Sequence, residues 1–464
     1  MGAKRNVAAT RSSQAEEVVD PDSEQVLERV CAIDVAKMFG MVCTRLPQRG
    51  PGDRRVSKTW EVSATTNAIM KLAGQLVDLK IEKVTLESTS DYWRIWFYLL
   101  QAQGLDVQLV NARDVKNVPG RPKTDKQDSV WLAKLTEKGL LRASFVPPPE
   151  IRNLRDYTRL RIDLTREQTR HWQRLEKLLE DALIKVSSVS STITTMSVRD
   201  MIEALIVGER DPRVLAKMAR GRMKVKYLAL VEALTGKFDE HHAELAQMLL
   251  DQIDGLQAQI DQLTARITDL IAAMQAAQAP VWQPPPDDGN GDNVARPPLP
   301  AVQRLAEIPG LSIVSAQIIL AEIGLDMSIF PTPEHLASWA KLTPVTAQSG
   351  SKKRSGKTGK GNPYLKGALG IAASSLAKTD THLAARHHRM VKRRGKLKAL
   401  VATARNLLII VWHLLSDPTQ RFKDLGSDYH NNRLDVGRRI RNHKHQLEAL
   451  GYDVTITPRT AAAA

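Results

Sequence analysis

The sequence predicts an α/β domain at the N-terminus, then an α-helical region with a coiled coil, and then a second, mainly α-helical domain. Three observations predict this architecture. Strand and helix patterns alternate over residues 26–146, helical periodicity dominates from residue 147, and a Pro- and Gly-rich stretch over residues 279–299 interrupts the helical part. With 464 residues, the chain is long enough to form two or three separate hydrophobic cores.

The first domain begins with three predicted strands. The segment VLERVCAIDVA (26–36) is apolar, and VCTRLPQRGP (42–51) and RRVSKTWEVSAT (54–65) are separated by Gly and Pro residues that predict a turn. Residues 67–80 then have the i, i+3, i+4, i+7 apolar spacing of a helix, and KVTLEST (83–89) is a short apolar segment that predicts a buried strand.

The rest of this domain continues the alternation. Residues 91–104 predict a helix that ends at Gly104, residues 105–112 a strand, and residues 125–139 a last helix. Thr124 and Gln127 fit a capping box at the start of that last helix. Three strands followed by alternating helices and strands is the element order of the ribonuclease H/RuvC-like fold.

Four carboxylates occupy defined places in this pattern: Asp34 on the first strand, Glu87 at the end of the fourth, and Asp125 and Asp128 on the last helix. The two helix acids are three residues apart, so they share a helix face. Converging carboxylates suit Mg²⁺ or Mn²⁺, and two such ions about 3.5–4 Å apart can stabilise both reacting oxygens of a phosphodiester. The alternative is that each acid only ends a strand or begins a helix, which is reasonable for one acid but not for four in order.

The segments LESTSDYW and VNARDVKNVPGRPKTDKQDSVWLAKL resemble the catalytic segments of the DEDD transposases of bacterial insertion sequences, the family numbered one hundred and ten. The resemblance assigns the same four acids to catalysis. It also implies a C-terminal transposase domain with a nucleophilic serine, and guidance by a structured non-coding (bridge) RNA. Two departures occur: Ala32 stands where a Gly often precedes the first acid, and Ser90 where a Gly often follows Glu87.

The composition indicates a polyanionic partner. Lysine and arginine total 67 against 51 acids, a net charge of +16, which favours DNA or RNA over a neutral ligand. The two cysteines, Cys31 and Cys43, have no metal-ligand spacing and predict reduced core thiols of a cytoplasmic or nucleoid-associated protein. No apolar run approaches the ~20 residues of a membrane span, and the N-terminal residues 1–25 lack a secretory core and predict a disordered leader.

A long arginine-rich helix is predicted over residues 150–182. Its arginines do not all fall on one face, so some would pair with nearby acids and the others could contact phosphates, while interleaved aromatic side chains could stack on exposed bases. In the related family this neighbourhood helps to hold the guide RNA. The candidate RNA contacts on this helix are Arg159, Arg166, Arg170 and Trp172.

A heptad pattern follows over residues 239–278, with apolar residues spaced alternately four and three apart. The helix could pack against the arginine-rich helix of its own chain or pair with another protomer, which would give a dimer or tetramer. His241 and His242 lie at its start and are expected to be surface residues rather than metal ligands. The heptad positions are Leu249, Ile253, Leu256, Ile260, Leu263, Ile267, Leu270 and Met274.

After the linker, Pro309-Gly310 followed by an apolar helix ending at Gly324 resembles a helix-hairpin-helix, a motif in which backbone N–H groups can meet a DNA phosphate. A tight turn between two packed helices would have the same pattern. The helix HLASWAKL (335–342) then leads into a Ser-, Gly- and Lys-rich loop, and a further helix is predicted from Asn362-Pro363.

This basic loop is the second predicted site. A flexible loop could bind phosphates without chemistry, whereas an exposed hydroxyl among cations could attack DNA phosphorus and form a phosphoserine linkage. The resemblance assigns the nucleophile to Ser349; Ser351 stands where the family commonly has Gly, which leaves Ser351 as a second candidate. The cations expected to neutralise phosphate here are Lys352, Lys353, Arg354, Lys357 and Lys360.

The C-terminal part is basic and helical. The cluster from Arg386 to Lys398 suits nucleic-acid backbone contact, and Arg393 and Arg394 are the residues chosen from it. The apolar residues 407–415 are too few to span a membrane and predict a core helix.

These patterns divide the chain into seven segments. They are a disordered leader (1–25), a RuvC-like DEDD domain (26–146), a basic helical region (147–238), a coiled coil (239–278), a linker (279–299), a transposase domain with the serine loop (300–380) and a basic helical extension (381–464).

The predicted function is RNA-guided DNA transposition, in which magnesium-binding acids and a serine nucleophile cut and exchange strands of donor and target DNA. One alternative is a metal-dependent nuclease or Holliday junction resolvase that uses water and needs only the acids. Another is a basic nucleic-acid-binding scaffold without chemistry, for which substituting Asp125 and Asp128 would be harmless. Base specificity is expected to come from RNA pairing, as in other RNA-guided systems.

Overall fold

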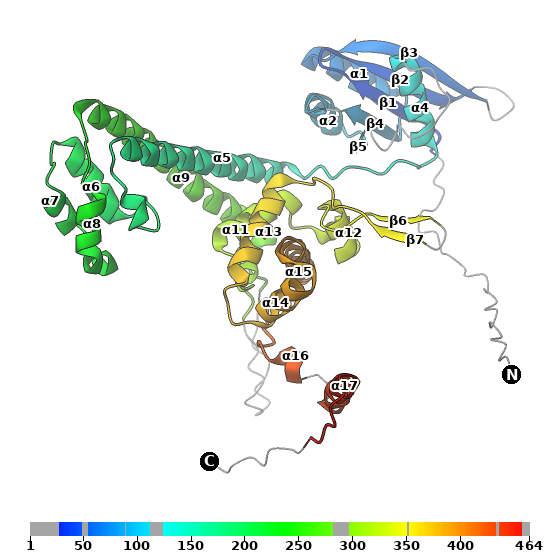
Figure 1. Ribbon diagram of the computed structural model, residues 1–464. Coiled ribbons are helices and arrows are strands. Elements are labelled where there is room, and N and C mark those ends of the chain that lie inside the picture. Colours follow the sequence, from blue (N-terminus) through cyan, green and yellow to red (C-terminus); the bar gives the residue numbers. More distant parts are fainter. Residues whose placement is uncertain are drawn as a thin grey trace. The chain divides into compact units, whose positions relative to one another are not determined.

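The chain divides into two compact units, residues 1–146 and 147–464, each described here by itself. The predicted leader and most of the predicted linker lie outside the residues that this computed structural model describes (Figure 1). The described residues are 27–48, 54–88, 90–111, 124–281, 297–349, 352–432 and 436–456.

A five-stranded mixed sheet with the order β3-β2-β1-β4-β5 forms the first unit (Figure 1). The first three strands pair antiparallel, whereas β4 joins β1 in parallel and β5 joins β4 in parallel. The sequence predicted all five strands. Their bounds are β1 Val30–Val35, β2 Phe39–Pro47, β3 Arg55–Ser63, β4 Lys83–Ser88 and β5 Val107–Asn111.

Helices cover both faces of this sheet. Because side chains alternate along a strand, Cys31 and Ile33 of β1 join one core with α1 (Thr66–Asp78) and α2 (Trp93–Ala102). Val30 and Ala32 join a second core on the opposite face, with Leu132 and Ala133 of α4 (Asp125–Glu137). The α/β architecture predicted for this region is confirmed.

A pair of long helices begins the second unit: α5 (Pro149–Asp181) and α9 (Glu240–Ala273). They run antiparallel, since Gln168 of α5 donates to Gln257 of α9 at 2.9 Å and Asp181 at the end of α5 meets His242 at the start of α9. Five short helices between them share one hydrophobic core with both. We call residues 182–239 the lobe; its helices are η1 Val186–Ser188, α6 Met196–Ile206, α7 Pro212–Lys217, η2 Gly221–Lys226 and α8 Tyr227–Ala233.

The predicted heptad helix therefore packs along the arginine-rich helix of its own chain (Figure 1). Ile253 and Ile267 are buried in this arrangement, whereas the middle heptad positions Leu256, Ile260 and Leu263 remain half-exposed. A heptad records that a helix has an apolar seam but not which helix covers it. Pairing between protomers stays a prediction.

The remaining helices surround α15 (Lys396–Ser416), which packs against α10 (Ala301–Ala306), α12 (Pro333–Trp339), α13 (Pro363–Leu376) and α14 (His382–Arg394). The other elements of this part are η3 Gln275–Ala277, α11 Ile313–Ile323, η4 Met327–Ile329, β6 Thr346–Ser349, β7 Lys352–Ser355, α16 Tyr429–Asn432 and α17 Val436–Ala449.

In the described residues, α15 is the one helix long and apolar enough to cross a membrane by length and composition. The helix is longer than the nine-residue apolar stretch that the sequence analysis singled out, because Ala399, Thr403 and Ala404 extend its buried face. Leu407, Leu408 and Val411 are fully buried in the described chain, as expected for a core helix.

The segment compared with a helix-hairpin-helix forms α10, a turn and α11. Gly310 in the turn has φ +86°, and a Cβ at this position would lie 2.3 Å from the carbonyl oxygen of Ala372. The glycine is therefore needed for close packing against α13. Packing between helices is therefore enough to explain the Pro309-Gly310 pair. The pair gives no separate support for a phosphate-binding helix-hairpin-helix.

Candidate active site

The sheet register brings the first two acids together. Asp34 of β1 lies directly opposite Glu87 of β4 in the parallel pair, and each is near the carboxyl end of its strand. Both acids are on the face of α4: Asp34 follows Val30 and Ala32 at intervals of two, and Glu87 follows Thr85, whose hydroxyl accepts a 2.8 Å hydrogen bond from Thr136 of α4. Two carboxylates thus emerge side by side beneath one helix.

Helix α4 carries the other two acids. Its N-cap is Thr124, whose hydroxyl accepts a hydrogen bond from the Gln127 N–H at 3.4 Å, so half of the predicted capping box is present. Asp125 is the first residue of the helix, and Asp128 is half-buried one turn later. The far end of α4 is held by Glu137, which pairs with Arg45 and Arg55 of the sheet. Because α4 packs on the sheet face that carries Asp34 and Glu87, its first turn, with Asp125 and Asp128, is on the same side of the sheet as these two acids.

These residues fit a hard divalent cation by their chemistry. Asp34, Glu87 and Asp128 share one face and offer only carboxylate oxygens, the donors that Mg²⁺ and Mn²⁺ prefer. They are not yet gathered around one point: in the described residues, the one group whose ligand atoms lie within 4.8 Å of one another is a different one, discussed below.

The predicted serine loop is an antiparallel hairpin. Strands β6 and β7 pair from Thr346 and Ser355 at the base to Ser349 and Lys352, the last backbone pair before the turn. Ser349 thus ends a strand, where the sequence suggested a flexible loop. Gly350 and Ser351, which connect the strands, lie outside the described residues.

The base of this hairpin is held by short backbone contacts, although its residues are largely exposed. The Gly356 N–H donates to the Val345 carbonyl at 2.7 Å, and a Cβ on Gly361 would lie 2.5 Å from the Ala340 carbonyl, at a φ of +61°. Lys366 donates from its Nζ to two carbonyls of the intervening segment, at 2.7 and 3.1 Å, and burial lowers the pKa of its ammonium group. The strands therefore extend from a fixed base.

A buried ion-pair network joins this base to α5. Glu322 of α11 is fully buried and accepts two hydrogen bonds from the Arg159 guanidinium, both at 2.8 Å. It also accepts from the side-chain amide of Asn362 at 2.5 Å, and Asn362 caps α13 directly after the hairpin. Burial alone would lower the pKa of Arg159, but the hydrogen bonds that it donates to Glu322 raise this pKa above its ordinary value. One carboxylate therefore links three elements.

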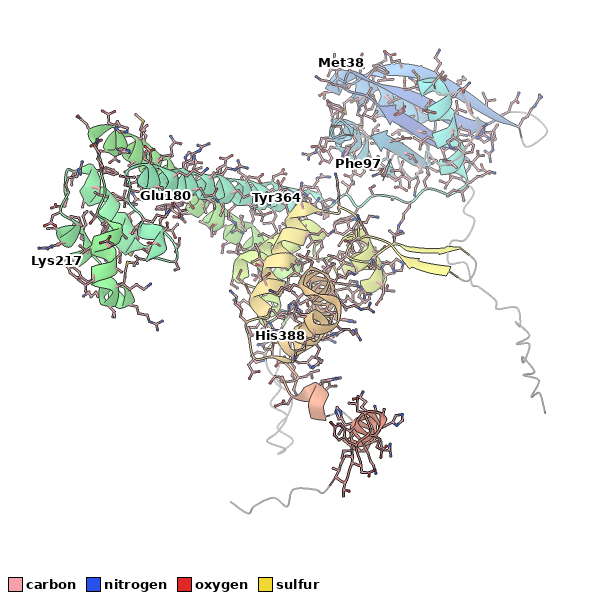
Figure 2. All side chains as sticks on the ribbon, viewed as in Figure 1. Met38, Phe97, Glu180, Lys217, Tyr364 and His388 are labelled. Atoms are coloured by element: carbon pink, nitrogen blue, oxygen red, sulfur yellow. The ribbon has the colours of Figure 1, made fainter. Side chains whose placement is uncertain are left out.

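Tyr364 extends the network (Figure 2). Its hydroxyl donates to Asp163 of α5 at 2.9 Å, and the guanidinium groups of Arg159 and Arg166 lie 4.8 and 5.4 Å from its ring centre. Burial, followed by the hydrogen bond to Asp163, raises the pKa of Tyr364. The start of α13 is thus attached to α5 by charge, hydrogen bonds and cation–π contacts.

Several predicted nucleic-acid contacts therefore have partners inside the chain. Arg159 is committed to Glu322, and Arg166 pairs with Asp163 at 3.0 Å while remaining about half exposed. Arg155 and Arg161 also bind α11, through backbone carbonyls and the Gln317 side chain. Much of the arginine content of this helix therefore serves packing within the chain, and the ion pair with Glu322 accounts for the position of Arg159 without a phosphate.

The other predicted cations are accessible where the structure describes their side chains. These exposed residues are Arg170, Lys357, Lys360, Arg393 and Arg394. Their contact with nucleic acid stays a prediction.

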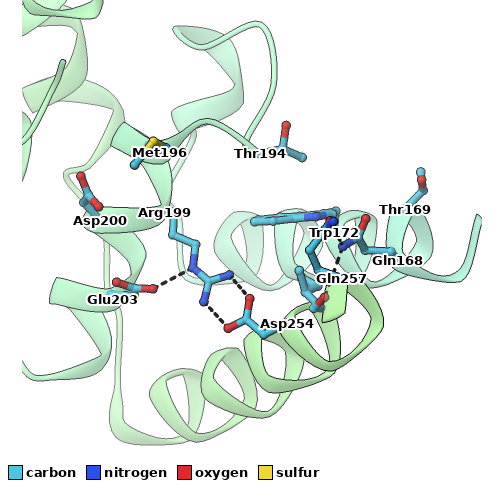
Figure 3. A pocket seen from close by; sticks show the side chains of 11 residues that line it. Gln168, Thr169, Trp172, Thr194, Met196, Arg199, Asp200, Glu203, Asp254 and Gln257 are labelled. Carbon is cyan, nitrogen blue, oxygen red and sulfur yellow. Dashed lines mark hydrogen bonds and ion pairs between the residues drawn. The ribbon is translucent and has the colours of Figure 1, made fainter. Parts of the chain in front are cut away.

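Trp172 lines a cavity of about 570 Å³ between α5, α6 and α9 (Figure 3). Arg199 crosses this cavity wall, donating to both oxygens of Asp254 at 2.7 and 2.6 Å and to Glu203 at 2.7 Å. The hydrogen bonds that Arg199 donates to Asp254 raise the pKa of Arg199, and its positive charge is paired with the carboxylates of Asp254 and Glu203. The wall is unsuited to phosphate, and a base stacking on Trp172 remains the prediction for this residue.

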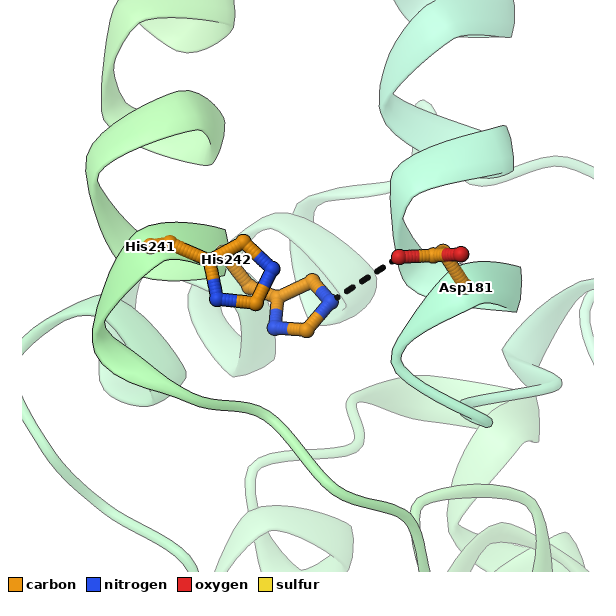
Figure 4. A group of neighbouring side chains, drawn as sticks. All are labelled: Asp181, His241 and His242. Atoms are coloured by element: carbon orange, nitrogen blue, oxygen red, sulfur yellow. Dashed lines mark hydrogen bonds and ion pairs between the residues drawn. The ribbon is translucent and has the colours of Figure 1, made fainter.

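A second group of ligand-type side chains joins the ends of α5 and α9: Asp181, His241 and His242 (Figure 4). His242 was expected at the surface but is buried, because its Nδ1 accepts the Asp239 N–H at 3.1 Å as part of a capping box. The proton must then reside on Nε2, which donates to Asp181 at 3.3 Å. A metal on Nε2 would need that proton removed, so this group serves the helix ends.

The residues that sequence reasoning missed are Glu322, Asn362 and Tyr364. Glu322 lies in IVSAQIILAEI, where its charge gives no sign of burial. Asn362 was noted only as a helix start. The one available signal was composition: an acid in an otherwise apolar helix requires a cation, and a helix rich in arginine precedes it.

Comparison with known proteins agrees with this two-part arrangement. A family described as "Transposase", with a DEDD domain, matches residues 31–184, and the family described as "Transposase IS116/IS110/IS902 family" matches residues 302–388. The chain is also 26% identical over 320 residues to the insertion element IS110 uncharacterized 43.6 kDa protein of Streptomyces coelicolor, covering 65% of this chain and 72% of that protein. The first match contains the four acids, and the second contains the hairpin with Ser349.

Proposed function

Because the chain carries both domains of the IS110 transposase family and so belongs to it, we propose that it is an RNA-guided DNA recombinase with a phosphoserine intermediate. The observation that carries the proposal is the strand register, which places Asp34 of β1 directly opposite Glu87 of β4 on the sheet face covered by α4. The family acts on DNA; the metal, the nucleophile and the RNA are the proposed details. A bacterial cytoplasmic or nucleoid-associated location goes with this function.

Asp34, Glu87, Asp125 and Asp128 would hold the metal on the face beneath α4. A bound Mg²⁺ or Mn²⁺ there would supply electrostatic stabilisation of the charge that develops on the phosphodiester oxygens. The protein's part is to fix two acids by sheet register and two by the capped helix. The sheet register and the helix cap thus fix the backbone positions from which these donors extend.

Ser349 would act as the nucleophile. Its hydroxyl loses a proton and its Oγ bonds to DNA phosphorus, while the bond between phosphorus and one deoxyribose oxygen breaks and that oxygen takes up a proton. One phosphoester replaces another, so rejoining needs no external energy source. The fixed base of the hairpin, described above, supports a nucleophile that reaches outward into a bound DNA.

The proposed complex also contains a structured guide RNA and a second protomer. The excess of 16 positive charges favours nucleic acid. The half-exposed heptad residues Leu256, Ile260 and Leu263 offer an apolar strip for a partner helix, consistent with a dimer or tetramer. Recombination between two DNA molecules requires such an assembly.

The test uses full-length protein with Mg²⁺, the RNA that flanks the element, and labelled donor DNA. We expect a covalent protein–DNA adduct on denaturing gels, mapped to Ser349 by peptide mass spectrometry and absent from Ser349→Ala. Ser351→Ala is the matched control, because it removes a hydroxyl two residues away in the sequence. An adduct that maps to Ser351 would reassign the nucleophile, and cleavage that persists without any adduct would instead establish a RuvC-like nuclease that uses water.

A further inference from the structure

A strongly basic stretch of the lobe has no part in the site described above. Residues 213–226 hold six cations and no carboxylate, within a helical lobe that otherwise mixes both signs of charge. We call this stretch the basic segment; it covers most of α7 and all of η2. Its cations are Arg213, Lys217, Arg220, Arg222, Lys224 and Lys226.

Most of these cations are available to a partner. Arg213, Lys217, Arg222 and Lys224 are exposed and form no ion pair with the residues that the structure describes. Arg220 is the exception, pairing with Asp200 at 2.5 Å. On α7, Arg213 and Lys217 are four residues apart and so project from one face, and Figure 2 shows Lys217 pointing away from the lobe.

The segment is nevertheless anchored. Leu215 is fully buried, Ala216 and Ala219 are nearly so, and all three belong to the core that the lobe shares with α5 and α9. The Arg220 N–H donates to the Ser197 hydroxyl at 2.9 Å, and Lys226 donates to the Val189 carbonyl at 2.6 Å. The exposed cations thus extend from a fixed platform, which lowers the entropy lost when they bind a ligand.

The chemistry of the segment selects its partner. Three of the six cations are lysines, which are depleted in protein–protein interfaces, and residues 213–226 contain none of the aromatic side chains that such interfaces favour. Both features argue against a protein partner. Binding in a membrane surface needs a continuous apolar face. In residues 213–233 the large apolar side chains that are mostly exposed are Val225 and Leu228, at 91% and 80%, whereas Leu230 and Val231 of α8 contribute to the core. Tyr227 packs against the same core, so no exposed ring in the segment offers a base a stacking platform. Cations without stacking aromatics suit a phosphate backbone.

We propose that the basic segment binds the phosphate backbone of a structured nucleic acid, in a manner independent of base sequence. The proposal rests on the function proposed above, which supplies two polyphosphates, the RNA and the donor DNA. In this proposal the main electrostatic contact with nucleic acid is made by the lobe. The arginines at the start of α5, Arg155, Arg159 and Arg161, instead bind α11.

The experiment measures the affinity of the full-length protein for the element's flanking RNA and, separately, for a donor-end DNA duplex, from 50 to about 300 mM salt. The test variant is Lys217→Ala/Arg222→Ala/Lys224→Ala. The matched control removes the same number of exposed cations outside the segment, Lys177→Ala/Lys237→Ala/Arg266→Ala. Thermal unfolding of both variants shows that the fold is kept.

With one of the two ligands, we expect the test variant to lose about 2 to 3 units of the slope of log K against log salt, roughly one for each phosphate contact, while the control keeps the wild-type slope. The arm in which the slope falls identifies RNA or DNA as the partner. Equal slopes for wild type and test variant in both arms, or an equal loss in the control, would overturn the proposal.

Two further outcomes separate this inference from the proposed function. If wild type binds RNA and DNA but the test variant binds them equally well, the segment has another role and the recombinase proposal stands. If wild type binds neither ligand, both proposals fail. Binding to vesicles with anionic lipid headgroups that depends on the segment, with nucleic-acid binding unchanged, would also overturn the inference and assign the cations to a lipid surface.

Discussion

The acids and the serine are held in place by different physical means. Asp34 and Glu87 are neighbours because two parallel strands pair in one register, and the register is fixed by alternating buried residues on both faces. Ser349 ends a four-residue strand whose own pairing is short, and its base depends on a buried carboxylate on another helix, Glu322. The acid site is built locally, whereas the serine site depends on contacts between distant segments.

This difference has a consequence for mutation. A change at an acid should remove chemistry and largely keep the fold, because the two hydrophobic cores on either face of the sheet are formed by apolar side chains. A change beneath the serine hairpin should alter stability first and chemistry only through position. The two sites are therefore distinguishable by which quantity responds.

The largest expected effect is on the acid side. Asp34→Asn should reduce DNA cleavage by on the order of 10³-fold or more, because an amide cannot replace the charge of a metal-binding carboxylate. The measurement is cleavage of labelled donor DNA over a Mg²⁺ titration, with far-UV circular dichroism as the check on folding. The control is Asp106→Asn, which removes a largely exposed carboxylate beside β5 that pairs with Lys83. Full activity of Asp34→Asn would contradict a catalytic role.

The next effect is on the serine side. Glu322→Ala removes the fully buried partner of Arg159, and breaking a buried pair in this way costs about 3–5 kcal/mol of unfolding free energy. We expect the lower end of that range, since the Arg159 side chain is 30% exposed and keeps some water. Urea denaturation measures the loss, and hydrogen exchange of α13 amides locates it.

Glu180→Gln is the control for that experiment, because its pair with Lys185 is a surface pair and should contribute less than about 1 kcal/mol. If the two substitutions had equal effects, the buried network would not be what holds the hairpin base. A variant that keeps metal-dependent nicking but yields fewer serine adducts would identify Glu322 as a positioning residue.

The same comparison explains what the sequence could predict. The strands and the capped helix that carry the four acids could be predicted because each has a local signature in the sequence, whereas the catalytic role of the acids stays a prediction. The hairpin was mistaken for a loop because TAQSGSKKRS has few β-branched or aromatic residues. Glu322 was missed because its partner Arg159 is 163 residues away in the chain, and no local pattern encodes such a contact. The partner of the heptad helix was left open for the same reason.

A smaller effect concerns the backbone of the hairpin base. Gly361→Ala should destabilise the protein by about 2 kcal/mol or more, because it combines a φ of +61° with a Cβ that would lie 2.5 Å from the Ala340 carbonyl. Gly367→Ala is the control: this helical glycine in α13 has open space at its Cβ position and should gain about 0.5–1 kcal/mol. Shifts of the urea midpoint in opposite directions would support a fixed hairpin base. An unchanged midpoint for Gly361→Ala would show that the backbone of the base can move to make room for the added methyl group.

The smallest effect sharpens the claim that the acid-bearing sheet is rigid. Cys31 and Cys43 are buried in β1 and β2, and burial raises the pKa of both thiols, that of Cys43 to about 11. Since the unfolded chain loses these protons near pH 9 and the folded chain keeps them, stability should fall as pH rises from about 9 to 11. Because the thiolate is the reactive form, a thiol reagent at pH 8 should modify neither cysteine in the native protein and both in urea. Rapid native labelling would mean that the strand carrying Asp34 opens readily, and then the contrast between a rigid acid site and an indirectly held serine would not hold.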